Sequence, residues 1–191
     1  MKPFILTEFI FILLSITGFV LKIALVFWGT PVLIIGLLGL SLIYFRQGLR
    51  PALLNDQPTA ASDRFFIPLY KLGYLLFAIN TLGVLFKSML WDTRFLGFSM
   101  FILMAYTIFI AAQVLKGKFF FKKLLIKSIF IATLALTFYQ TPLSKLIQLY
   151  YRDQPEFAQK FIEYRENPQN EVKKKNYLEA RKKMLNKNAK K

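Results

Sequence analysis

Among the polar and charged side chains that interrupt the long apolar segments of this 191-residue chain, six are candidates for chemistry inside a membrane. They comprise three lysines, one carboxylate and two amides: Lys22, Lys87, Lys127, Glu8, Asn80 and Gln113. An ionisable group inside a membrane segment is costly, so each suggests an ion pair, an ion pathway or a side chain that reaches the headgroups. The two amides could line a polar path, or they could join neighbouring helices through hydrogen bonds.

Several reaction types are excluded by composition. The chain has no cysteine and no histidine, so disulfides, thiolate chemistry, Cys/His metal sites and imidazole acid–base catalysis cannot occur. It also contains no G-x-S-x-G motif, no phosphate-binding glycine loop and no helix with paired carboxylates. We therefore expect a protein that is not an enzyme, with no catalytic residue, no cofactor, no bound metal and no small-molecule substrate.

The elements that position these residues are long apolar runs. The chain is 55% hydrophobic, and its apolar residues gather in blocks at 4–45, 65–90, 95–115 and 124–139. Runs of about 20 apolar residues match the hydrocarbon thickness of a bilayer, where helices satisfy every backbone group. The pattern predicts an all-α polytopic membrane bundle over residues 1–141. Its helices are expected at about 4–28, 31–46, 65–90 and 95–115, and in a fifth segment, 119–141.

Two stretches of the chain are similar to each other. Gly18, Lys22, Trp28 and Thr30 match Gly83, Lys87, Trp91 and Thr93 in order. The match predicts two tandem hairpin repeats, 4–46 and 65–115, with the same orientation in the membrane. Lys22 and Lys87 then either extend to the headgroups near each tryptophan or turn inward to a carboxylate, for which Glu8 and Asp92 are available.

The same residues resemble the transmembrane hairpin of the L subunit of the Bacteroidetes gliding-motility and type IX secretion motor. In that family a G-x-L-F-K-x-x-H-W-P-G junction precedes L-L-I-I-G-L. Residues 83–91 keep the Gly, Leu, Phe, Lys and Trp of this junction, residues 18–31 keep a Gly, Lys, Trp, Gly and Pro, and L-I-I-G-L follows at 33–37. The resemblance implies a bacterial inner-membrane scaffold of related hairpin design. The segments 31–46 and 95–115 contain no Asp or Glu to match the motor's acidic residue.

Basic residues between the apolar segments predict the orientation. Seven of them fall on the side that holds the N-terminus: Arg46, Arg50, Arg64, Lys116, Lys118, Lys122 and Lys123. Because cations in short loops stay inside, we expect a cytoplasmic N-terminus. Five spans then place the C-terminal tail on the opposite side. If the fifth segment, interrupted by Lys127, does not cross, four spans leave the tail in the cytoplasm, so its side stays open.

Residues 142–191 differ in character from the rest. Phe157, Phe161 and Tyr164 recur at helical spacing, and from Val172 onward nine basic residues accompany one acid. We expect a basic amphipathic helical tail whose candidate binding residues are Lys173, Lys174, Lys175, Arg181, Lys182 and Lys183. Anionic lipid, a protein partner or RNA could bind it, or it could simply be a solvated basic end.

These patterns favour a non-enzymatic membrane subunit, a scaffold or accessory component of a larger complex whose basic tail docks a partner or anionic lipid. One alternative is a small transporter or channel that uses the polar residues of the bundle. A further alternative is a membrane protein that docks a ribosome or RNA, with Tyr177 available for stacking on a base.

Overall fold

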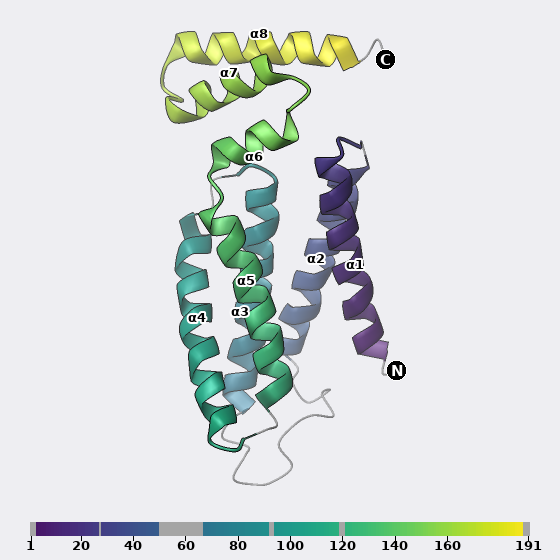
Figure 1. The fold of residues 1–191 in the computed structure, drawn as a ribbon, viewed down its shortest axis with the longest axis vertical. Coiled ribbons are helices and arrows are strands. Elements are labelled where there is room, and N and C mark those ends of the chain that lie inside the picture. Colours follow the sequence, from purple (N-terminus) through teal and green to yellow (C-terminus); the bar gives the residue numbers. More distant parts are fainter. Residues whose placement is uncertain (1–2, 27, 50–66, 92–93, 119–120, 189–191) are drawn as a thin grey trace. The chain divides into compact units, whose positions relative to one another are not determined.

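The computed structural model describes residues 3–26, 28–49, 67–91, 94–118 and 121–188, and the regular structure in these ranges is entirely helical (Figure 1). The eight helices of the described residues are, in chain order, α1 (Pro3–Ile23), α2 (Gly29–Leu49), α3 (Ile67–Ser88), α4 (Arg94–Leu115), α5 (Lys122–Gln140), α6 (Leu143–Tyr150), α7 (Pro155–Glu166) and α8 (Glu171–Asn188). The chain forms two compact units, Met1–Gln140 and Thr141–Lys191.

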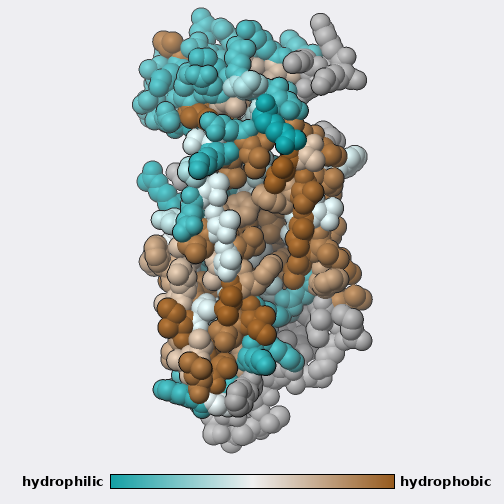
Figure 2. Space-filling view, viewed as in Figure 1, coloured by the Kyte–Doolittle hydropathy of each residue, from teal (hydrophilic) through white to brown (hydrophobic). Residues whose placement is uncertain are grey.

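The first unit is a bundle of membrane-length helices. Among the described residues, α1 to α5 are each long and apolar enough to cross a bilayer. Hydrophobic side chains cover most of the visible surface of these helices, whereas hydrophilic side chains dominate α7 and α8 (Figure 2). The prediction of an all-α fold is therefore confirmed for the described residues, and five of their helices are membrane-length candidates for spans.

Successive helices of the bundle run in alternating directions (Figure 1). α1 packs on α2, α2 packs on α3, and α3 packs on both α4 and α5, which also pack on each other. Buried side chains form two core clusters, one around Tyr44 and Phe77 and another around Leu37 and Met100. Contacts between α2 and α3 thus join the first hairpin to the remaining three helices.

α1 and α3 end with the same backbone geometry. Leu25 and Leu90 are the described non-glycine residues with positive φ, at 60° and 63°. The N–H of Leu25 donates to the Lys22 carbonyl, and that of Leu90 donates to the Lys87 carbonyl. Such left-handed residues close the C-terminus of a helix and reverse the chain. The predicted break at 28–31 is therefore wrong: the reversal lies between Ile23 and Gly29, and α2 already includes Gly29 and Pro31.

Glycines let the backbones of α1 and α2 approach closely. A Cβ atom added to Gly36 would lie 2.5 Å from the backbone nitrogen of Ser15, and one added to Gly18 would overlap the backbone of Leu33. At Gly39 the neighbour is the ring of Phe11. These close approaches follow the use of small residues at membrane helix interfaces.

Gly36→Ala should destabilise the bundle because its new methyl group meets backbone, which cannot move aside. We expect a loss of about 2 kcal/mol, within the range for overpacked sites, measured by denaturant unfolding in detergent with far-ultraviolet circular dichroism. Gly48→Ala is the matched control, since the nearest atom there is a mobile Leu75 side-chain carbon at 2.9 Å. Equal effects of the two variants would contradict close packing at Gly36.

Candidate functional site: an intramembrane ion pair and a basic helical hairpin

Glu8 and Lys127 form an ion pair that links the first and fifth membrane helices. The ammonium of Lys127 lies 2.5 Å from Glu8 Oε2, and the Tyr44 hydroxyl donates to Glu8 Oε1 at 3.0 Å. Glu8 is only 8% exposed. Its carboxylate therefore receives hydrogen bonds from α2 and α5, as a buried charge requires.

The ammonium of Lys127 also faces two aromatic rings. It lies 5.6 Å from the ring centroid of Tyr74 and 6.0 Å from that of Tyr44, both within the range of cation–π attraction. Four helices, α1, α2, α3 and α5, thus contribute side chains to one polar cluster. The local charges of Glu8 and Lys127 cancel, so both can lie inside an apolar layer.

The positions of Glu8 in α1 and Lys127 in α5 explain why the two side chains meet. α1 and α5 run in the same direction, and Glu8 and Lys127 each lie five residues after the first residue of their helix. At 1.5 Å per residue, both sit about 7.5 Å inside the bundle from the same end. Sequence reasoning considered Glu8 as a partner for Lys22 or Lys87 and missed Lys127, although matching depths could have indicated it. Asp92, the other suggested carboxylate, and Thr93 lie outside the described residues, as do Arg50 and Arg64.

Lys22 lies near the opposite end of the bundle, at the end of α3. Its ammonium donates to the Ser88 carbonyl at 2.6 Å and approaches the Met89 sulfur at 3.8 Å. The last carbonyl groups of a helix lack partners within the helix and carry partial negative charge, so a lysine there is favourable. Lys22 thus connects α1 to the end of α3. Lys87 is half-buried at that same end.

The buried amide of Asn80 joins α3 to α4. Its Nδ2 donates to the carbonyls of Leu76, at 2.9 Å, and Ser99, at 3.3 Å, and the Ser99 hydroxyl donates to its Oδ1 at 3.3 Å. Of the two roles considered for the amides, this geometry fits interhelical bonding. Gln113 is half-buried near the end of α4.

Other hydroxyl groups of the bundle bond in the same way. Ser41 donates to the Ala78 carbonyl at 3.0 Å and joins α2 to α3, while Thr107 and Ser128 share a hydrogen bond of 2.5 Å between α4 and α5. The bundle also contains a cavity of about 380 Å³ between α1, α2, α3 and α5. Aliphatic and aromatic side chains form most of its wall, among them Phe19, Leu37, Val84, Leu134 and Phe138. It is therefore unsuited to ions.

The second unit contains an aromatic cluster that fastens α8 to α7. Tyr177 of α8 stacks on Tyr164 and Phe161, with ring centroids 4.9 and 5.2 Å away, and Phe157 contacts Tyr151 at 4.8 Å. Burial raises the pKa of Tyr151; nearby Tyr177 adds to the rise and Arg181 opposes it. The predicted aromatic face of residues 157–164 is confirmed, and Tyr177 serves as a packing residue.

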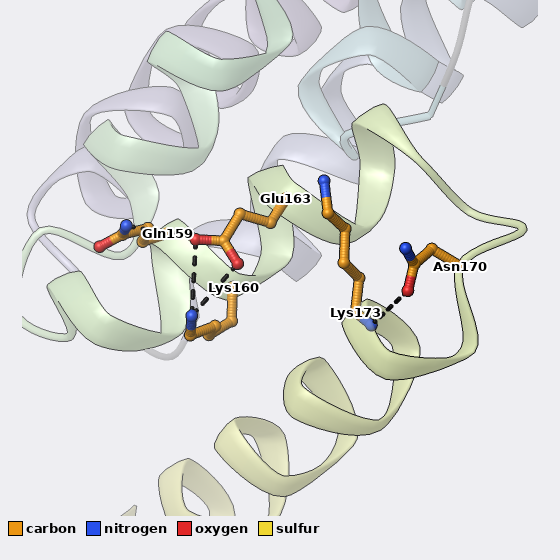
Figure 3. Close-up of polar contacts among 5 residues, drawn as sticks. All are labelled: Gln159, Lys160, Glu163, Asn170 and Lys173. Atoms are coloured by element: carbon orange, nitrogen blue, oxygen red, sulfur yellow. Dashed lines mark hydrogen bonds and ion pairs between the residues drawn. The ribbon is translucent and has the colours of Figure 1, made fainter.

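Local polar contacts stabilise α7 and α8, the two helices of a helical hairpin (Figure 3). Within α7, Lys160 pairs with Glu163 at 3.1 Å, an i,i+3 contact that supports an exposed helix face. The Asn170 side chain accepts a hydrogen bond from the Lys173 backbone N–H at 3.1 Å, so Asn170 caps the start of α8. The turn between α7 and α8 includes Asn167 and Pro168.

The cations of α8 differ in their contact with α7 and in their exposure to solvent. Lys183 faces Glu156 of α7 at 3.9 Å, and Lys173 is half-buried. Lys183 is nevertheless exposed, with 76% of its side chain accessible, as are the other four candidate cations: Lys174, Lys175, Arg181 and Lys182. The apolar residues of α8 do not form a single face. Its buried Ala180 and packed Tyr177 are opposed by two exposed leucines, so apolar residues occur on both sides.

Breaking the Glu8–Lys127 pair should cost more than replacing both residues. Glu8→Gln or Lys127→Met leaves one unpaired charge in an apolar setting, and we expect each to lose about 2 to 3 kcal/mol of unfolding free energy. The double variant Glu8→Gln/Lys127→Met should lose less than either single variant, because no charge is stranded. Denaturant unfolding in detergent measures all three. Lys71→Met is the control, since it removes an exposed lysine of α3; additive losses would refute the pairing.

The chain matches no protein-family model, and no curated protein or solved structure is significantly similar to it. The resemblance of residues 18–31 and 83–91 to the motor subunit therefore stays a prediction. Function has to be argued from the residues of the chain itself.

Proposed function

We propose that this protein is a non-enzymatic accessory subunit or scaffold of a larger membrane complex. In this proposal the five-helix bundle is an anchor, and the α7–α8 hairpin is a docking module for an anionic partner or lipid surface. The observation that carries the proposal is the set of exposed cations on α8. Five of the six candidate cations are exposed, on a helix that aromatic packing holds in a fixed rotation relative to α7.

The bonding of polar groups in the bundle supports an anchor over a transporter. Glu8 and Lys127 neutralise each other, Asn80 bonds to Ser99, and the hydroxyls of Ser41, Thr107 and Ser128 are engaged between helices. A pathway for a polar solute needs groups that face a hydrated space. Among the described residues, the cavity between α1 and α5 offers mainly hydrocarbon.

The ion pair also supports a five-span topology. Lys127 was the reason to doubt that the fifth segment crosses, and its charge is paired within the bundle. α5 packs on α3 and α4 and has the length and hydropathy of a span. With the N-terminus in the cytoplasm of a bacterium, five crossings of the inner membrane place the docking hairpin on the far side.

Deletion of residues 152–191 should release the partners of the protein while the bundle persists. We expect the full chain to migrate as a stable assembly in mild detergent, and the truncated chain to migrate as a smaller species. Size-exclusion chromatography with light scattering distinguishes the two. Tyr177→Ala, which opens the aromatic cluster, should weaken the assembly, whereas Tyr177→Phe preserves the stacking and should leave it intact. A monomeric full chain with a silent truncation would refute the subunit proposal.

A reporter fused after Lys191 tests the topology. Alkaline phosphatase, which is active only outside the cytoplasm, should be active at this position, and green fluorescent protein exported in unfolded form should be dark. The reciprocal fusions after Leu49, the last residue of α2, should give the opposite result, because that position follows two spans. Cytoplasmic signals from both positions would favour four spans.

A further inference from the structure

The outward face of α8 combines four cations with two exposed leucines. We propose that this face binds the surface of a bilayer that contains anionic phospholipids, with Leu178 and Leu185 entering the headgroup layer. The inference rests on the proposed function, in which the hairpin is a docking module. It deepens that function by naming the lipid surface as the partner and these six residues as the contact.

Helical spacing places the six residues on one side of α8. Leu178 and Leu185 are seven residues apart, which is two turns, and they are 42% and 53% exposed. Lys174 and Lys175 lie about one turn before Leu178, and Arg181 and Lys182 lie about one turn after it. All four cations are exposed. The acid that shares this side, Glu171, lies at the start of the helix.

α7 fixes which side of α8 faces outward. Tyr177 stacks on Phe161 and Tyr164 of α7, and Ala180 is buried. Lys183 pairs with Glu156 on that inner side. Because these contacts occupy one face of α8, the remaining side keeps both leucines and the four cations exposed, with Arg181 at its edge toward Tyr151.

The leucines favour a lipid surface over the other anionic partners. An interfacial helix buries apolar side chains at the level of the acyl chains while flanking lysines and arginines contact anionic headgroups. Phosphates of a nucleic acid would use the cations and leave both leucines in water. Base stacking would need a free aromatic ring, and Tyr177 is packed within the hairpin. The two leucines flanked by cations therefore match an anionic bilayer in both charge and apolarity.

The absence of native cysteine allows a direct experiment on the full chain. We would label Leu185→Cys with bimane, an environment-sensitive fluorophore, and reconstitute the protein in nanodiscs of phosphatidylcholine alone or with one third phosphatidylglycerol. The emission should shift to the blue only with phosphatidylglycerol, and high salt should reverse the shift because it screens the cations. The same label at Glu179→Cys, on the flank of the helix, should stay solvent-exposed in both.

A matched pair of variants separates the outward face from total charge. Lys174→Gln/Lys182→Gln removes two outward cations, whereas Lys173→Gln/Lys183→Gln removes two from the side of α7. Lys174→Gln/Lys182→Gln should lower the ratio of membrane-bound to unbound α8 by about 10-fold or more. Lys173→Gln/Lys183→Gln should change that ratio by less than about 3-fold. Equal effects of the two pairs, or no shift with phosphatidylglycerol, would overturn the inference. A shift caused by an added RNA oligonucleotide in place of phosphatidylglycerol would overturn it as well.

The lipid inference and the subunit proposal can fail independently of each other. If truncation after residue 151 dissolves the assembly but phosphatidylglycerol leaves the bimane signal unchanged, the hairpin docks a protein and only the lipid inference fails. If phosphatidylglycerol shifts the signal while truncation leaves the assembly intact, the lipid inference holds and the subunit proposal fails.

Discussion

Hydrocarbon does not solvate polar groups, and this constraint governs the membrane bundle. Glu8 can be buried in α1 because Lys127 and Tyr44 satisfy its carboxylate from α5 and α2. Asn80 and Ser99 meet the same requirement between α3 and α4. Each of these contacts joins different helices, so the requirement to satisfy buried polar atoms favours one specific helix arrangement.

The C-terminal hairpin solves a different problem in water. α8 has too few apolar side chains to form a hydrophobic core by itself. Its stability depends on the aromatic contacts with α7 and on the cap from Asn170. The same contacts decide its rotation. A chain end that composition describes only as basic therefore becomes a surface on which particular cations and particular leucines are presented together.

Sequence predicted the features that a single segment determines. The membrane helices follow from apolar runs whose length the bilayer fixes, and the aromatic face of α7 follows from helical spacing. The partner of Lys127 depends on how α5 packs beside α1, and the division of cations on α8 depends on where Tyr177 packs; neither is a local property. The first reversal was misplaced because Leu25 adopts positive φ, a conformation that leucine does not signal in a sequence.

The pairing of the first membrane helix with the last has a consequence for how the protein is made. Glu8 precedes Lys127 by 119 residues, so at bacterial or eukaryotic elongation rates its counter-charge emerges from the ribosome about 6 to 24 s later. During that interval α1 carries an uncompensated carboxylate, and its N-terminal turns are most stable near the lipid–water boundary. We therefore expect the contact that joins α1 to α5 to form only after synthesis of α5.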